Sequence, residues 1–389
     1  MRLIGTTAMG IRLPIISTGD DLVNITVDCV SRVLEEQNTK LLPTDIVAVT
    51  EALVAKSEGN FANIKDIGTD IKEKFGDAEI GLVYPMLSRN RFLNILKGVA
   101  LGAKKVHILL SYPHDEVGNP VMDLERLDDV TDKLQNRLTT AKEFREVAGE
   151  YRLVFTGVDY VELYKSVGDN IEIYFGNDPR DILKITKNIL VGEIHNRNKT
   201  KTRLEKAGAE KIYTLSDILN KSINGSGFNS AYGVLGSNLS TGEVLKLFPN
   251  NAPNFVEQLQ ARFKEKTGIA PEVMVYGDGA FKDPVCGIWE LADPVVSPGH
   301  TERLKNQPLE IKLKFVADSQ QDQSSEEREE TLKKAIKEKY DNPDVYREGT
   351  TPRVYADLVG SLCDLIGGSG DKGTPVILVR GYFDDYTIE

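Results

Sequence analysis

The first segment of the chain, residues 1–64, carries one helical and one strand pattern of apolar residues. Gly19-Asp20-Asp21 precedes the helical pattern, and aspartates are good helix N-caps. The apolar positions that recur at roughly helical spacing are Leu22, Ile25, Val30, Val33 and Leu34. The run IVAVT follows at 46–50, and a short apolar run of this kind is typical of a buried strand. We therefore expect a helix and then a buried strand ahead of Lys56.

Strand and helix patterns alternate through the second segment, residues 65–225. GLVYPM (81–86), a helix over 90–101 and VHILLSYP (106–113) form a strand–helix–strand unit, which favours parallel pairing. Further strands are predicted at YRLVFTG (151–157), IEIYFGN (171–177) and ILVGEIH (189–195). No G-x-G-x-x-G follows the first strand, so a dinucleotide-binding fold is not indicated.

The third segment, residues 226–389, begins after the small-residue loop 224–230. The patterns in it predict a helix over 254–266, the strand EVMVY, an exposed charged helix in EEREETLKKAIKEKY, a helix over 352–366 and the strand VILVRGYF. These elements together predict an α+β or α/β fold. We expect both chain ends to form one mixed-sheet core, with residues 65–225 as an inserted α/β lobe.

Composition narrows the class of protein. A chain of 389 residues exceeds what one core usually holds, so two or three lobes are expected. Its formal net charge of -11 argues against a general nucleic-acid binder, which usually presents a basic face. The three cysteines form no C-x-x-C pair, which favours a reduced cytoplasmic location without a disulfide framework. Neither a signal peptide nor an apolar run of membrane-spanning length is present, so we expect no membrane contact.

Two loops and one lysine are the candidates for chemistry. The loop 276–284 places Asp278 and Asp283 after the strand EVMVY, and hard cations such as Mg²⁺ prefer carboxylate oxygens, although D-G and D-P also form ordinary turns. The glycine-rich loop 367–375 lets backbone amides approach a phosphate, yet it is also a plausible helix-to-strand connection. Lys56 follows the strand IVAVT, where a lysine either reaches a phosphate or is merely solvated.

The order of several short motifs resembles the gamma-glutamyl ligases that elongate the deazaflavin coenzyme F-420. That family has G-D-D-L, then D-I-L-V-V, then S-K-A-E-G, and this chain has GDDL at 19–22, DIVAV at 45–49 and KSEG at 56–59. The similar motifs near the other end are Gly236-Ser237-Asn238, Leu247-Phe248-Pro249, Asp278, Ala356-Asp357-Leu358, Gly373-Thr374-Pro375-Val376 and Arg380-Gly381. The resemblance covers roughly 1–64 and 226–389.

The resemblance implies GTP (or ATP) and Mg²⁺ or Mn²⁺, a homodimer, and an amide bond formed between a small-molecule carboxylate acceptor and a glutamate-like amino acid. The reaction would pass through an acyl phosphate, which needs metals and positioning more than covalent help from the protein. Asp278 and Lys56 would be catalytic, and Asp278 and Asp283 would bind metal. The nucleotide would contact Leu13, Pro14, Lys56, Asn238, Gly368, Ser369, Gly370, Asp371, Lys372, Gly373 and Thr374.

This chain departs from the family pattern in three places. Leu235 stands where the family has a metal-binding aspartate, and Asp283 or Glu290 would have to replace that carboxylate. Gly279-Ala280-Phe281-Lys282 replaces the family's S-x-G-R, and the middle block exceeds what the family places there. The acceptor is therefore open: a folate fits as well as the deazaflavin coenzyme. Two alternatives remain, a non-catalytic nucleotide-binding regulatory protein on this scaffold, and a transferase whose middle lobe binds another substrate.

Overall fold

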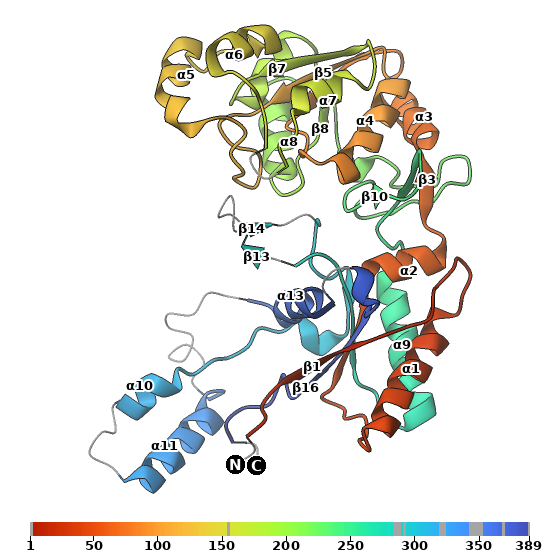
Figure 1. Ribbon diagram of the computed structural model, residues 1–389, viewed down its shortest axis with the longest axis vertical. Helices are drawn as coiled ribbons and strands as arrows, with labels where there is room; N and C mark the ends of the chain where they lie inside the picture. The colour runs from red at the N-terminus through yellow and green to blue at the C-terminus, as the bar shows by residue number, and fades with distance from the viewer. Residues whose placement is uncertain are drawn as a thin grey trace.

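The computed structural model describes residues 3–153, 156–279, 281–282, 289–290, 293–318, 324–341, 353–367 and 370–387. The two large sheets lie in separate parts of the molecule (Figure 1). One draws its strands from both ends of the sequence, and the other takes all of its strands from residues 79–214. We name them the terminal sheet and the middle sheet. The described part of the chain has the α+β character that the apolar patterns predict.

The terminal sheet is mixed, with strand order β1-β16-β2-β12-β15. β2 and β12 are parallel, and the other neighbouring pairs are antiparallel. Its strands are β1 (Thr7–Ile11), β2 (Ile46–Thr50), β12 (Glu272–Tyr276), β15 (Gly299–His300) and β16 (Val376–Arg380). The expected common core from both chain ends is thus present in the sheet pairing, whereas the boundaries at 64 and 225 stay a prediction.

Helices cover both faces of the terminal sheet (Figure 1). Side chains alternate along a strand, so Val47 and Val49 face α1 (Leu22–Glu36) and α9 (Ala252–Thr267). Ile46 and Ala48 face α13 (Tyr355–Gly367) on the other side. This burial on both faces explains why IVAVT is continuously apolar.

The middle sheet has strand order β6-β7-β5-β4-β8-β9, and all of its strands except β6 are parallel. Its strands are β4 (Glu79–Val83), β5 (Lys105–Leu110), β6 (Thr139–Thr140), β7 (Ile171–Phe175), β8 (Asn188–Val191) and β9 (Lys211–Thr214). Counted along the chain, the parallel strands have the order 3-2-1-4-5. This is the arrangement of a doubly wound sheet, and its direction reverses between β4 and β8.

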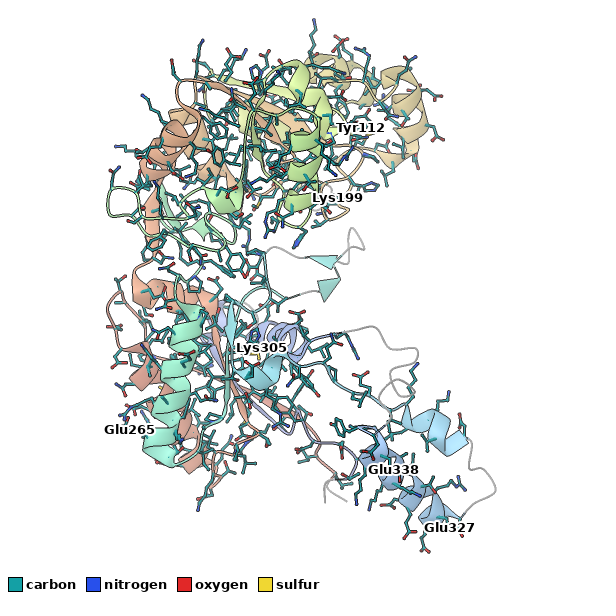
Figure 2. The ribbon with its side chains drawn as sticks, turned by 180° about the vertical axis from the view of Figure 1, so that it is seen from behind. Tyr112, Lys199, Glu265, Lys305, Glu327 and Glu338 are labelled. Carbon is teal, nitrogen blue, oxygen red and sulfur yellow. The ribbon has the colours of Figure 1, made fainter. Side chains whose placement is uncertain are left out.

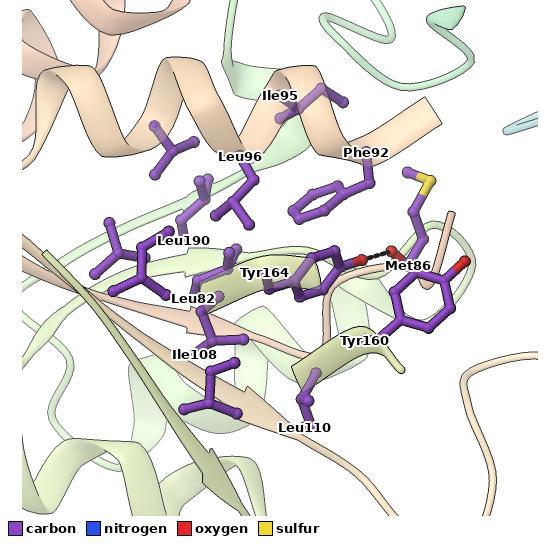
Figure 3. Close-up of a cluster of buried hydrophobic side chains, with 14 of the residues drawn as sticks. Leu82, Met86, Phe92, Ile95, Leu96, Ile108, Leu110, Tyr160, Tyr164 and Leu190 are labelled. Atoms are coloured by element: carbon purple, nitrogen blue, oxygen red, sulfur yellow. Dashed lines mark hydrogen bonds between the residues drawn. The ribbon is translucent and has the colours of Figure 1, made fainter. Parts of the chain in front are cut away.

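The helix α4 (Arg89–Gly102) lies on one face of the middle sheet and connects β4 to β5. Figure 3 shows Phe92, Ile95 and Leu96 of this helix packed over the strands and near Tyr164. The Tyr164 hydroxyl donates to the Met86 carbonyl at 2.7 Å, which holds the segment before α4 in place. α3 (Ile64–Phe75) packs closely against α4, because a Cβ on Gly102 would lie 2.3 Å from the Gly68 carbonyl. The segment before α4 and the last turn of the helix are therefore both held in place.

The opposite face of the middle sheet is covered by α8 (Arg197–Lys206) and the 3-10 helix η2 (Pro179–Lys184). A third, small sheet joins β10 (Asn238–Leu239), β11 (Val244–Lys246) and β3 (Phe61–Asn63). The remaining elements are α2 (Glu51–Glu58), α5 (Leu127–Leu134), α6 (Ala141–Ala148), α7 (Tyr160–Lys165), α10 (Leu313–Asp318), α11 (Ser325–Glu338), β13 (Phe281–Lys282), β14 (Trp289–Glu290), η1 (Leu124–Arg126), η3 (Leu215–Asp217), η4 (Glu302–Lys305) and η5 (Gly370–Lys372).

Most of the predicted elements form, and one does not. α11 confirms the exposed charged helix, and Figure 2 shows Glu327 and Glu338 directed into solvent. The strand predicted at YRLVFTG is wrong for the described residues of that run, where Arg152 makes only an isolated bridge with Asp159. Tyr151 is instead fully buried against Phe144 and Phe175, so its apolar character serves the core. None of the helices described here is long and apolar enough to cross a membrane.

Candidate active site

Four chain segments meet at one edge of the terminal sheet, by which we mean the edge formed by the ends of its strands. β1, β2 and β12 run in the same direction, so their carboxyl ends lie together, beside the start of the antiparallel β16. The Thr50 amide donates to the Pro375 carbonyl at 3.0 Å, which holds the end of β2 against the glycine-rich loop. The loops that carry the predicted metal and nucleotide residues therefore share this edge.

Four carboxyl groups gather beside the ends of β2 and β12, and we call them the acidic cluster: Glu51, Asp278, Asp293 and Asp364. The Asp278 amide donates to Asp293 Oδ2 at 2.8 Å, and the Gly279 amide donates to Asp364 Oδ2 at 3.0 Å. A side chain at position 277 would press on this cluster, because a Cβ there would lie 2.4 Å from Asp293 Oδ2.

Two cations from distant parts of the chain pair with this cluster. Arg91 of α4 donates from Nη1 to Asp293 Oδ1 at 2.7 Å and from Nη2 to Asp278 Oδ2. Lys246 of β11 contacts both oxygens of Glu51, at 2.5 and 2.7 Å. Arg91 follows β4 in the chain, and Asp278 follows β12. Their ion pair therefore links the carboxyl end of the middle sheet to that of the terminal sheet.

The acidic cluster holds more negative than positive charge. Among the described side chains, four carboxyl groups face the two cations Arg91 and Lys246, so acids outnumber cations by two there if every acid is ionised. Burial, opposed by Lys246 and reinforced by Asp293 and Asp278, raises the pKa of Glu51 to about 7. Burial and the nearby Asp278 also raise the pKa of Asp293 and of Asp364. Burial, reinforced by the neighbouring carboxylates, thus favours the protonated form of these acids.

A hard divalent cation suits this donor chemistry, because Mg²⁺ and Mn²⁺ prefer carboxylate oxygens. With Arg91 on Asp278 and Asp293, however, no three His, Cys, Asp or Glu side chains of the described residues are arranged to hold a metal ion. The predicted ligand Asp283 lies outside the described residues, and only the backbone of Glu290 is described. Leu235 is fully buried and belongs to the same apolar core cluster as Leu245 and Leu247, so the residue at this position packs into the core.

Asn238 and Lys56 lie at different distances from the cluster. Asn238 is the cross-strand partner of Lys246, and side chains of such pairs have Cβ atoms roughly 5 Å apart. It therefore lies next to the Lys246–Glu51 pair. Lys56 is five residues beyond Glu51 in α2, roughly 7 Å along the helix. Its side chain is exposed and pairs with no carboxylate that the structure describes.

The other predicted nucleotide residues flank the same edge. Leu13 packs against the α1 side of the terminal sheet, and Pro14 is exposed. Thr374 lies beside Gly10, where a Cβ would be 3.0 Å from the threonine Cβ. Residues 9–12 and Thr374 line a cavity of about 590 Å³ together with Val33 and Gln37. Gly370, Asp371 and Lys372 form the short helix η5, Gly373 follows it, and Gly368 and Ser369 lie outside the described residues.

Several motif residues have structural roles. Arg380 donates to the buried Asp45 at 3.0 and 3.2 Å, at the edge of the sheet opposite to the acidic cluster. Asp21 caps α1 by accepting from the Asn24 amide, and Gly59 ends α2 with a φ of 68°. A second cavity, of about 560 Å³, lies where the GDDL motif (19–22) and the KSEG motif (56–59) meet the loop 225–228 and the start of α9. Its lining includes Asp20, Asp21, Ser57, Glu58, Gly59, Asn250 and Asn254.

Five residues of this site were not predicted from the sequence: Arg91, Lys246, Glu51, Asp293 and Asp364. Arg91 looks like an ordinary surface residue of a helix, and Lys246 like one residue of a short strand. The position of Glu51 could have marked it as a candidate, since it directly follows the buried strand IVAVT. The others acquire meaning only when the strand ends come together.

Comparisons with known proteins agree with the motif order. The family model described as F420-0:Gamma-glutamyl ligase matches residues 10–381, a range that includes the middle segment. No curated protein matches the chain. The biosynthetic arginine decarboxylase SpeA from Campylobacter jejuni shares 11% identity over 93% of this chain and 68% of that one, with a TM-score of 0.13, which is too low to carry an argument. The family match spans nearly the whole sequence, and the chain therefore belongs to the F420-0:gamma-glutamyl ligase family.

Proposed function

We propose that the protein is a nucleotide- and metal-dependent ligase that joins a glutamate-like amine to the carboxylate of a small acid, forming a gamma-glutamyl-type amide. The observation that carries this proposal is the acidic cluster, in which four carboxyl groups of the described residues lie with Arg91 and Lys246 at the carboxyl ends of β2 and β12 in a chain of this ligase family. Strand ends of this kind are common ligand positions in α/β sheets.

Asp278 would bind Mg²⁺ or Mn²⁺ through a carboxylate oxygen. Asp293 lies next to it and accepts a hydrogen bond from its amide. The Asp278 side chain is 47% exposed and projects from a glycine-flanked loop, so a cation from solvent can reach it. Asp283 stays a predicted further ligand. A bound divalent cation would neutralise phosphate oxygens during phosphoryl transfer.

GTP or ATP would lie along the edge between Leu13 and η5. Exposed Lys56 and Lys372 have no carboxylate partner in the part of the chain that the structure describes, so both are available to a triphosphate. Asn238 would contact the nucleotide from the β10 side.

The reaction would proceed in two balanced steps. A carboxylate oxygen of the acceptor attacks the terminal phosphorus, and the bond to the nucleoside diphosphate breaks, which leaves an acyl phosphate. The amine nitrogen then attacks the acyl carbon, inorganic phosphate leaves, and the amine proton passes to a base or to solvent. The protein's part is to hold the reactants in line and to compensate charge.

The acceptor is an acid other than, or besides, the deazaflavin coenzyme; a folate is the main alternative. The buried Leu235 favours a second candidate function, a non-catalytic nucleotide-binding regulator, because it removes a carboxylate from the family pattern. A small-molecule partner, a cytoplasmic location and a homodimer belong to the same proposal, without nucleic-acid or membrane partners.

Phosphate release from GTP and from ATP tests the proposal, measured with Mn²⁺, L-glutamate and either the deazaflavin coenzyme or a folate. We expect release that requires both glutamate and one acid. Nucleotide binding without acceptor-dependent release would support the regulator instead. Absence of both Mn²⁺ and nucleotide binding would remove the ligase site altogether.

A further inference from the structure

Arg91 contacts the acidic cluster in two unequal ways. Its Nη1 donates at 2.7 Å to Asp293, whose side chain is 1% exposed, and its Nη2 donates to Asp278, whose side chain is 47% exposed. Leaving a buried carboxylate without its arginine partner is costly, so the contact with Asp293 is the durable one. The contact with Asp278 exchanges readily, since water or a ligand can replace the guanidinium there.

The backbone around Arg91 fixes where its guanidinium points. Ser88 caps α4 by accepting from the Arg91 amide at 3.2 Å, and Tyr164 anchors the preceding segment through the Met86 carbonyl. A guanidinium presents several N–H donors in a planar fork that matches a carboxylate. Arg91 is already engaged with two carboxylates, which shows the chemistry that this position recognises.

The carboxyl ends of β4 in the middle sheet and of β12 in the terminal sheet both lie close to Arg91. Arg91 lies in the first turn of the helix that follows β4, next to the point where the doubly wound sheet reverses direction, and ligands of such sheets bind at that edge. Asp278 follows β12 at the carboxyl edge of the terminal sheet. A molecule bound by Arg91 would therefore lie between the two sheets and beside the proposed metal ligand.

We propose that Arg91 is a substrate-binding residue that the middle segment contributes to the ligase site. Its Nη1 would stay on Asp293, and its Nη2 would leave Asp278, the residue that would hold a divalent cation, for the carboxylate of the acid acceptor. This inference rests on the proposed ligase function and extends it: the acceptor enters from the side of the middle sheet, and it takes the place on Arg91 that the Asp278 carboxylate occupies in this structure.

The test uses Arg91→Lys in the full-length protein, because lysine keeps a charge for the buried Asp293 but lacks the second arm of the fork. Arg89→Lys is the matched control, since Arg89 lies in the same helical turn and is exposed. Mn²⁺ binding is followed by electron paramagnetic resonance without nucleotide. Glutarate, a plain dicarboxylate probe, is then titrated into the Mn²⁺-loaded protein by calorimetry, and Arg91→Gln with Asp293→Asn serves as a second, charge-balanced variant.

We expect Arg91→Lys and the double variant to weaken glutarate binding at least tenfold, whereas Arg89→Lys binds it like the wild type. Mn²⁺ affinity should be unchanged or higher in Arg91→Lys, because a weaker competitor then faces Asp278. Equal glutarate affinity in all proteins would overturn the role of Arg91 and leave the ligase proposal standing. Lost Mn²⁺ affinity in Arg91→Lys would also overturn it, since Arg91 would then shape the metal site. A wild type that binds no Mn²⁺ would overturn both proposals.

Discussion

The ammonium of Lys246 contacts both carboxylate oxygens of Glu51 across 195 residues of sequence. Glu51 begins α2 at the end of β2, and Lys246 ends β11, so this pair ties the small sheet to the terminal sheet. Both side chains are largely buried, at 11% and 13% exposure. The pair joins two parts of the chain that the sequence places far apart.

Removing Lys246 should therefore destabilise the fold. We expect Lys246→Met to lower the free energy of unfolding by roughly 3 kcal/mol at pH 8, because the buried Glu51 then loses its partner and must either stay ionised alone or take up a proton. Urea unfolding measures the change. The double variant Lys246→Met with Glu51→Gln should recover much of the loss, and an additive loss in the double variant would show that the pair does not carry the effect.

A pH-dependent contribution to stability should come from Glu193, next to the carboxyl end of β8. Its side chain is buried, Oε2 has no partner among the described atoms, and burial raises its pKa to about 7 from an ordinary 4.5. The folded protein thus binds a proton that the unfolded chain releases between about pH 4.5 and 7, so stability falls as pH rises through that window.

Glu193→Gln removes this titration while keeping the shape of the side chain. We expect the variant to exceed the wild type in unfolding free energy by about 2 kcal/mol at pH 8 and by little at pH 5. Thermal unfolding at the two pH values checks this. A difference that does not change with pH would mean that Glu193 keeps an ordinary pKa.

Restoring the family's aspartate at position 235 should fail. Leu235 is fully buried among apolar side chains, so Leu235→Asp should cost at least about 3 kcal/mol of stability, because it buries a charge without a partner. Leu235→Met keeps the volume and should cost less than about 1.5 kcal/mol. Chemical denaturation compares the two. If Leu235→Asp were as stable as the wild type and bound Mn²⁺ more tightly, position 235 would belong to the metal site.

Asp278→Ala should abolish most of the acceptor-dependent phosphate release. Loss of a metal ligand typically removes several kcal/mol of transition-state stabilisation, so we expect a fall of roughly 100-fold or more. Asp77→Ala, at an exposed aspartate of the middle segment, should keep full activity. Full turnover in Asp278→Ala would count directly against the proposed ligase site.

Local periodicity was sufficient to predict most of the elements. The continuous apolar run of β2 and the spaced apolar residues of α1 follow from burial on two faces and on one face. The prediction of a strand at 151–157 failed because Tyr151 and Leu153 are side chains of a loop that packs into the core. Periodicity records burial, and burial alone does not distinguish a strand from a packed loop.

The sequence by itself determined the order of the motifs, and with it the ligase family that the family model confirms. It also placed Asp278 at the end of a buried strand, because a residue after a strand needs no tertiary information to be located there. Only the tertiary structure decided that Arg91 and Lys246 supply the compensating charges and that Leu235 faces an apolar core. Ion pairs and side-chain burial depend on which distant segments come into contact. The periodicity of apolar residues within one helix or strand contains no information about those contacts.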